Sequence, residues 1–127
     1  MLDAWTYNVF PNIAPWGGFG PNISYRWRPW PDQDATLMEV RLLFPTPAGQ
    51  SRPRAAEMRF LNEDEPWATV TDWGALGSVF DQDMANLPYV QDGLKSSAND
   101  RVELGNYQES RIRHFHATLD KYLAGEL

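Results

Sequence analysis

The chain has 127 residues, of which 43% are hydrophobic, 13% aromatic and 22% charged, and it contains no cysteine. These proportions exclude an intrinsically disordered chain, and the length predicts a single domain over residues 1–127 with enough apolar material for a core. The formal net charge of −6 disfavours nucleic acid as a partner because the phosphate backbone would be repelled. The lack of cysteine excludes disulfides and cysteine-ligated clusters within these residues.

The start of the sequence and the length of its apolar runs predict a soluble, cytoplasmic protein. Residues 1–5 carry neither the basic residues nor the apolar run of a signal peptide. No stretch approaches the roughly 18 apolar residues that a membrane span needs. We therefore expect no contact with a membrane.

The N-terminal segment predicts one strand followed by a loop. Residues 5–9 alternate between two faces in the manner of a half-buried strand. Residues 15–22 contain three glycines and two prolines, which favour a loop over a helix or a central strand.

A hairpin is predicted next. Residues 24–28 and 37–44 alternate with the period of a strand, and the segment between them has the composition of a turn. In such a hairpin Arg26 or Arg28 would pair with Glu39 across the two strands on the solvent-facing side. We expect an antiparallel pair here.

The middle of the chain gives weaker signals. Residues 45–53 have the composition of a connector, rich in proline and small polar side chains. Residues 54–67 are compatible either with a short strand around residues 58–61 or with an acidic loop, and the sequence does not decide between them.

After Trp67 the apolar period becomes helical. On a wheel with about 100° per residue, the apolar side chains share one face, Asp83 falls in the middle of that face at about 340°, and Asp81 falls on the polar side at about 140°. Pro88 should end this helix and lie in the first turn of a second one, over residues 88–94, before a polar link over residues 95–100. The apolar face of the first helix consists of Leu76, Val79, Phe80, Met84 and Leu87.

Asp83 is the most informative of these positions. Burying an ionised carboxylate among apolar side chains costs several kcal/mol unless it is paired, hydrogen-bonded or bound to a metal. A salt bridge to an arginine, or a kinked helix that lets Asp83 cap the turn of Pro88, would remove the cost without any function. A functional carboxylate is the other explanation, and the residues alone leave these alternatives open. By the same wheel, Asp81 is expected to face solvent.

The last element is predicted as a long helix over residues 102–123 that Gly125 ends. Strands followed by helices indicate an α+β fold in which helices cover one face of an antiparallel sheet. Phe115 and Leu119 are expected to be buried against that sheet. The whole apolar face of this helix comprises Leu104, Tyr107, Ile112, Phe115, Leu119, Tyr122 and Leu123.

The two histidines, His114 and His116, lie two residues apart within this helix. Side chains at i and i+2 point about 200° apart on a helix, so both cannot hold one metal ion at about 2.1 Å. Surface contacts beside Arg111 and Arg113 are the simpler interpretation.

Four stretches of the sequence carry a family resemblance: YNVFPNIAPWGGFG, ISYRWRPWPDQDATLMEVRLLFP, LGSVFDQDMANLPYVQDGLKSS and YQESRIRHFHATLDKYL. Together they resemble the C-terminal part of the α subunit of Rieske-type aromatic-ring-hydroxylating oxygenases, over nearly the whole chain. The most specific stretch is the acidic run over residues 80–91, where that family places the aspartate of its mononuclear iron site. The resemblance implies that Asp83 is this iron ligand.

The resemblance also implies a fold, a reaction and partners. The fold would be of the helix-grip, Bet v1-like type, with an apolar substrate pocket for which Val79, Phe80, Leu87, Phe10 and Trp27 are candidates. The reaction would be O₂ activation at Fe(II) held by two histidines and one carboxylate, with hydroxylation of an aromatic or alicyclic ring. Electrons would come from a [2Fe-2S] Rieske cluster, which a ferredoxin or a reductase would reduce. The complete enzyme would be a homotrimer or a larger oligomer acting on a small apolar substrate.

The sequence departs from the family pattern in its ligands. It contains no Cys-x-His pair and no two histidines about five residues apart, so the Rieske cluster and two iron ligands would have to lie elsewhere. We therefore expect a C-terminal catalytic portion, incomplete without an N-terminal, Rieske-containing portion. The alternative is a non-enzymatic helix-grip module that binds a small molecule and has lost its metal.

Overall fold

A computed structural model describes residues 3–18, 22–99 and 101–127. The chain divides into two compact units. The sheet unit consists of Met1–Pro53 and Glu103–Leu127, and the helical unit consists of Arg54–Val102. An antiparallel sheet and three α-helices make up the predicted α+β fold, which is confirmed. The expectation of a single domain stays a prediction.

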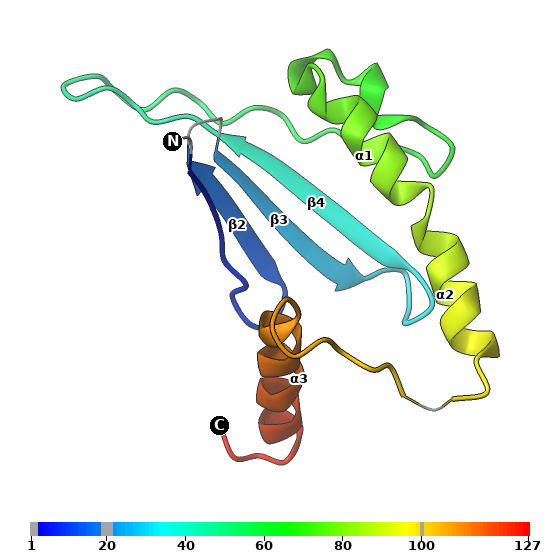
Figure 1. Cartoon of the computed structure of the whole chain (residues 1–127). Coiled ribbons are helices and arrows are strands. Elements are labelled where there is room, and N and C mark those ends of the chain that lie inside the picture. The colour runs from blue at the N-terminus through cyan, green and yellow to red at the C-terminus, as the bar shows by residue number, and fades with distance from the viewer. Residues whose placement is uncertain (1–2, 19–21, 100) are drawn as a thin grey trace. The chain divides into compact units, whose positions relative to one another are not determined.

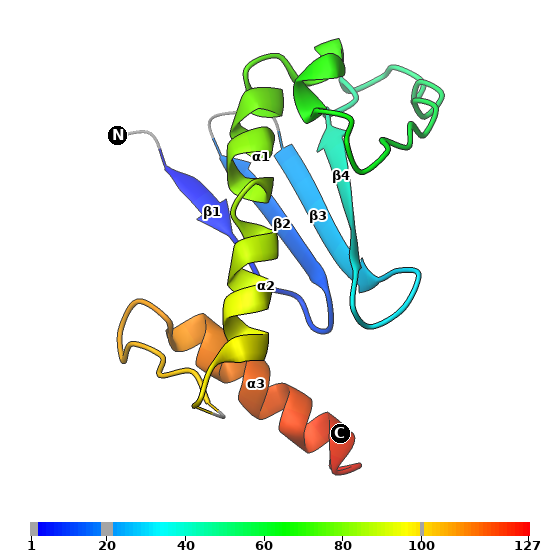
Figure 2. The same ribbon diagram turned by 90° about the vertical axis from the view of Figure 1, so that its right-hand side faces the viewer.

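The sheet unit is built on four strands in the order β1-β2-β3-β4, each antiparallel to its neighbour (Figures 1 and 2). Their bounds are β1 Ala4–Thr6, β2 Ile13–Gly18, β3 Asn22–Pro29 and β4 Thr36–Leu43. The predicted hairpin is therefore confirmed as β3 and β4. Its turn is closed by a hydrogen bond from the Trp30 N–H to the Ala35 carbonyl, at 3.0 Å.

The prediction of a loop in place of β2 is wrong for its described part, because β2 is an inner strand that pairs with both β1 and β3. Pro15 has no N–H to donate, yet its carbonyl accepts a hydrogen bond from the Tyr7 N–H at 3.0 Å. Gly18 has a φ of 142°, and a Cβ there would lie 2.3 Å from the Asp3 carbonyl oxygen. The glycine therefore permits a close approach of two backbones. The rest of the predicted loop, residues 19–21, lies outside the described residues.

The two faces of β3 differ in chemistry because side chains alternate along a strand. One face carries Ile23, which is 2% exposed, and the stacked rings of Tyr25 and Trp27, whose centroids lie 5.5 Å apart. The opposite face carries Arg28, whose Nε lies 2.8 Å from Oε1 of Glu39. The predicted pairing is confirmed.

Glu39 also forms ion pairs with two other arginines on this face of the sheet. Arg26 lies directly opposite in the register, with Nη1 3.9 Å from Oε1, and Arg41 places Nη2 3.4 Å from Oε2. Three guanidinium groups thus share one carboxylate.

The C-terminal helix α3 spans Ser110–Leu123 and contacts the segment after β1. The Phe10 ring lies 5.8 Å from that of Phe115 and 5.7 Å from that of Tyr122, measured between centroids. Arg111 donates a hydrogen bond to the Thr6 carbonyl at 3.0 Å. Phe115 is therefore half-buried and contacts the segment between β1 and β2. Burial against the strands themselves was expected.

The predicted start of α3 is wrong by eight residues, because polar side chains hold the preceding segment out of the helix. The Glu109 carboxylate accepts the Gly105 N–H, and the Arg113 guanidinium donates to the carbonyls of Gly105 and Asn106. Such side-chain bonds to the backbone compete with helix formation. Tyr107, assigned by the wheel to the apolar face, is 90% exposed. Gly125, with a φ of 73°, follows the helix end as predicted.

The helical unit begins with an irregular segment, and the open choice over residues 54–67 is resolved as a loop. Two short 3₁₀ helices follow, η1 (Trp67–Thr69) and η2 (Thr71–Trp73), and then α1 (Leu76–Met84) and α2 (Leu87–Ser96). Figure 2 shows α2 continuing from α1. Pro88 lies in the first turn of α2, as predicted.

Charge is divided unevenly between the units. The helical unit has nine acidic and four basic residues, whereas the sheet unit has eight and seven. Most of the net negative charge therefore belongs to the helical unit.

Candidate functional site

The site centres on α1, which packs on η1 through its glycine. Gly77 is buried, and a Cβ built there would lie 2.8 Å from Cα of Ala68 and 3.0 Å from the Trp67 carbonyl oxygen. Only a residue without a side chain allows this approach. The backbone of η1 therefore occupies the space above Gly77.

Phe80 lies one turn further along the same face of α1 and is 3% exposed. Its ring meets Trp67 with centroids 5.3 Å apart and Trp73 with centroids 5.6 Å apart, both edge to face. Such aromatic pairs contribute about 0.5 to 1.5 kcal/mol each beyond the burial of their surface. The three rings form the aromatic core of the helical unit.

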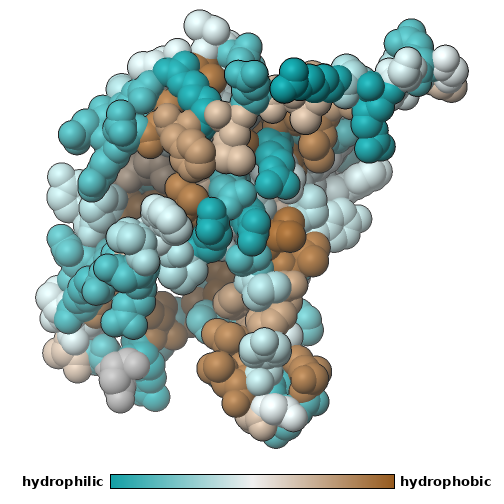
Figure 3. Space-filling view, turned by 180° about the vertical axis from the view of Figure 1, so that it is seen from behind, coloured by the Kyte–Doolittle hydropathy of each residue, from teal (hydrophilic) through white to brown (hydrophobic). Residues whose placement is uncertain are grey.

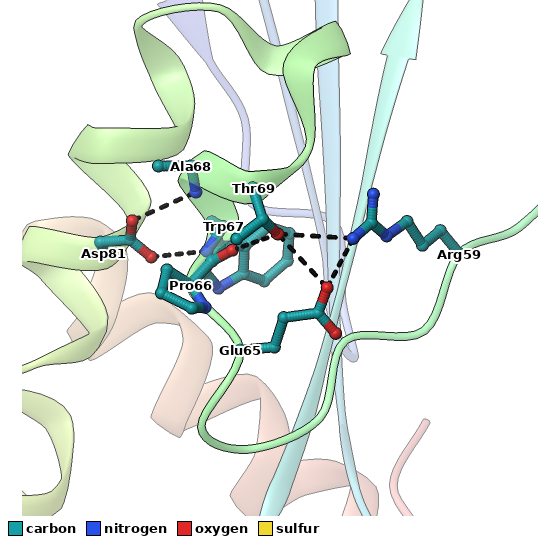
Figure 4. Close-up of polar contacts among 7 residues, drawn as sticks. All are labelled: Arg59, Glu65, Pro66, Trp67, Ala68, Thr69 and Asp81. Atoms are coloured by element: carbon teal, nitrogen blue, oxygen red, sulfur yellow. Dashed lines mark hydrogen bonds and ion pairs between the residues drawn. The ribbon is translucent and has the colours of Figure 1, made fainter.

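Asp81 is the polar partner of this packing (Figure 4). Its Oδ1 accepts the Trp67 N–H at 2.6 Å and its Oδ2 accepts the Ala68 N–H at 3.1 Å. The first N–H groups of a helix have no partner within that helix, so a carboxylate there supplies the missing acceptors. Both oxygens of Asp81 are therefore engaged. The expectation that Asp81 faces solvent is wrong.

Asp83 lies on the other side of α1. The residue is exposed, and among the described residues its carboxylate has no hydrogen-bond or ion-pair partner. The expectation that it is buried in the apolar face is wrong, and neither a salt bridge to an arginine nor a cap on the turn of Pro88 is found among the described contacts. Both of its oxygens are free to bind a ligand.

The error has a physical origin in Gly77. A hydrophobic wheel gives glycine no weight, so it centred the buried face near Leu76 and Asp83. The observed face is rotated toward Gly77 and Asp81, because η1 packs where the side chain is missing. An isolated glycine inside a helical pattern was the signal in the sequence that could have revealed this contact.

Two exposed apolar residues lie four positions from Asp83 in the sequence, one in α1 and one at the start of α2. Val79, four residues before it, is 47% exposed, and Leu87, four residues after it, is 52% exposed. Of the predicted pocket residues, these two are exposed, as Asp83 is, whereas Phe80 faces the aromatic core.

The loop before η1 is fixed by a second polar cluster (Figure 4). Nη2 of Arg59 lies 2.5 Å from Oε1 of Glu65 and 3.4 Å from Oγ1 of Thr69. The Thr69 hydroxyl donates to the Pro66 carbonyl at 2.7 Å. The hydrogen bond from Arg59 lowers the pKa of Glu65 from its ordinary value, against the opposing effect of desolvation. This cluster anchors both ends of η1.

The other predicted pocket residues, Phe10 and Trp27, belong to the sheet unit. Trp27 stacks on Tyr25, and Phe10 lines an open apolar groove of about 480 Å³ beside α3. Figure 3 shows hydrophobic side chains at the surface in the region where Figure 1 places α3. The groove is lined by Phe10, Pro11, Leu119, Tyr122, Leu123 and Leu127.

His114 and His116 are both exposed on α3. The His116 ring meets Phe115 edge to face at 5.6 Å between centroids. Within the described ranges, no three His, Cys, Asp or Glu side chains are grouped so that they could hold a metal ion. In the same part of the chain, no helix is both long and apolar enough to cross a membrane.

A comparison with protein families shows to which family the chain belongs. The family described as ring hydroxylating alpha subunit (catalytic domain) matches residues 2–125. The chain belongs to this family. No curated protein and no solved structure matches it. The resemblance found in the sequence is therefore confirmed, and α1, with its free carboxylate, is part of a ring-hydroxylating α-subunit catalytic domain.

Proposed function

We propose that the chain is the C-terminal catalytic portion of an iron-dependent oxygenase that hydroxylates an aromatic or alicyclic ring, and that Asp83 is the carboxylate ligand of its iron. The observation that carries the proposal is the contrast between the two carboxylates of α1. Asp81 uses both oxygens on backbone N–H groups, whereas Asp83 is exposed and uses neither. Within a family of ring-hydroxylating catalytic domains, a free carboxylate at this position suits one place in a two-histidine, one-carboxylate site.

The donor chemistry fits Fe(II) at one ligand position. A carboxylate oxygen binds first-row divalent metals at about 2.0 to 2.2 Å, and its charge offsets part of the metal's. The two imidazole ligands would come from outside these residues, together with the Rieske [2Fe-2S] cluster and its ferredoxin or reductase donor. Iron bound there would supply the activation of O₂.

The chain's own residues would hold and shield the substrate. Val79 and Leu87, each four residues from Asp83 in the sequence, are exposed and apolar, so they could contact a small apolar substrate close to the metal. The complete enzyme would be a homotrimer or a larger oligomer.

The test compares two carboxylates in the complete oxygenase. Asp83→Asn keeps the size of the side chain but removes its charge, so iron content and ring hydroxylation are expected to fall together. Asp92→Asn makes the same change at an exposed position of α2 and should leave both intact. Full iron content and full activity in Asp83→Asn would contradict the proposal.

The isolated chain provides a second check. One carboxylate among water molecules is a poor metal site, so the 127-residue chain alone is expected to bind Fe(II) weakly or not at all. One tight Fe(II) site per isolated chain, measured by isothermal titration, would contradict this ligand assignment. It would instead favour His114 and His116 as metal ligands.

A further inference from the structure

Among the described contacts, the hydrogen bonds between α1 and η1 both end on one carboxylate. The Trp67 and Ala68 N–H groups donate to the two oxygens of Asp81, at 2.6 and 3.1 Å (Figure 4). Asp81 is half-buried, and its hydrogen bond from the Trp67 N–H is partly shielded from water. The carboxylate therefore fastens one side of α1 to η1.

Gly77 allows the backbones of α1 and η1 to approach each other closely at the same contact. It lies one turn before Asp81, and any Cβ there would press on the backbone of Ala68 and Trp67. A hydrogen bond and a steric fit thus act on the same side of the helix. The contacts of Asp81, Gly77 and Phe80 can all be made at only one rotation of α1 about its own axis.

The rotation of α1 decides where Asp83 points. Residues two apart on a helix project about 200° from one another, so fixing Asp81 inward turns Asp83 outward. A helix rolled toward the rotation that the wheel predicted would carry Asp83 into the packed face. The direction of the free carboxylate thus depends on the contacts of its neighbour.

The surface to which α1 is fastened is itself held in place. Arg59, Glu65 and Thr69 tie η1 to the loop before it, and the Trp67 ring packs on Phe80. Asp81 therefore binds to an anchored turn.

From these contacts we propose that Asp81 is a positioning residue for Asp83: by holding α1 to η1 it fixes the direction in which the Asp83 carboxylate meets a metal ion. This inference rests on the proposed function, because it takes Asp83 as the ligand. Asp81 itself does not touch the metal. Groups that hydrogen-bond a metal ligand typically change metal affinity by about 10- to 100-fold when they are replaced, and we expect an effect of this order for a group that orients the ligand's helix.

The test opens the contact in two independent ways, in the complete oxygenase. Asp81→Asn replaces one acceptor oxygen by an NH₂ group that cannot accept an N–H. Gly77→Ala leaves every charge in place and adds a methyl group against Ala68. The matched controls are Asp92→Asn and Gly93→Ala in α2, and a Cβ at Gly93 would meet nothing within 4 Å.

The measurements are the dissociation constant for Fe(II), the visible absorption spectrum of the Co(II)-substituted protein and the far-ultraviolet circular dichroism of each variant. Co(II) absorption reports the geometry of the ligands, which a loss of stability alone would not alter. Asp81→Asn and Gly77→Ala are expected to fold, to bind Fe(II) about 10- to 100-fold more weakly and to change the Co(II) spectrum. Both controls should match the wild type.

The outcomes separate this inference from the proposed function. Wild-type metal binding in Asp83→Asn would overturn both. Loss of binding in Asp83→Asn, with wild-type affinity and spectrum in Asp81→Asn and Gly77→Ala, would overturn the positioning role alone. Failure of both test variants to fold, with folded controls, would also overturn it, because the contact would then serve stability only.

Discussion

Glu65 links a single side chain to a pH dependence of stability. Its pKa is lowered in the folded chain, mainly by the hydrogen bond from Arg59. A lowered folded-state pKa contributes stability that is present above the ordinary value of the carboxyl and is lost as the pH falls through the folded-state value. Glu65→Gln should therefore flatten the acid side of the stability profile. Urea unfolding between pH 7 and pH 3 measures this.

Glu63→Gln is the matched control, since Glu63 is an exposed glutamate in the same loop. Its profile should follow that of the wild type. Equal flattening in both variants would show that the general acidity of the loop is responsible and that the bond to Arg59 is not.

For the two carboxylates of α1, the sequence predicted the wrong directions, whereas the role of Asp83 as an iron ligand stays a prediction. The resemblance selected Asp83, and the structure leaves that carboxylate free. The wheel assigned Asp83 inward and Asp81 outward, which is the reverse of their observed exposure. Periodicity records where apolar side chains lie, whereas the orientation of α1 depends on backbone that approaches Gly77 from η1. That contact is made by the tertiary structure and leaves only a glycine in the sequence.

Among the elements, α3 allows a direct test of its face. Leu119 is half-buried and lines the groove beside Phe10, so Leu119→Ala should lower the free energy of unfolding by about 1 to 2 kcal/mol. Full burial against the sheet would have implied a larger loss. His114 is exposed on the same helix, and His114→Ala should change stability by at most about 0.5 kcal/mol. Chemical denaturation measures both, and equal losses would mean that α3 presents a different face.

The strands show where local patterns suffice. The β3–β4 hairpin follows from alternation and from a turn-forming segment, both of which are local. β2 escaped prediction because Pro15, Gly17 and Gly18 are poor strand residues on their own. It is a strand because two neighbours offer hydrogen bonds and because glycine permits the close contact with Asp3. Hydrogen bonds to the two neighbouring strands therefore stabilise β2, although its own residues have a low strand propensity.

For the molecule as a whole, the exposed apolar surface predicts association. Among the described residues, only Ile23 and Phe80 are buried hydrophobic side chains, and large apolar residues such as Trp5 and Phe44 are exposed. β1 and β4 are the edge strands of the sheet, and unpaired edges with apolar side chains favour pairing between chains. The isolated chain should therefore form oligomers or aggregates that grow with concentration. A monodisperse monomer in sedimentation velocity runs would contradict this and favour the independent binding module.

The uneven division of charge has a consequence for kinetics. Asp83 belongs to the unit with nine acidic and four basic residues, so the proposed metal ion would approach it through an attractive field. Such a field would enrich divalent ions near α1 before any ligand bond forms, and its range would be about 8 Å at physiological ionic strength. Added salt should therefore slow the capture of a metal ion more than it speeds its release. Through its other acidic residues, the helical unit would set the rate of loading, while the ligands would set how long the ion stays.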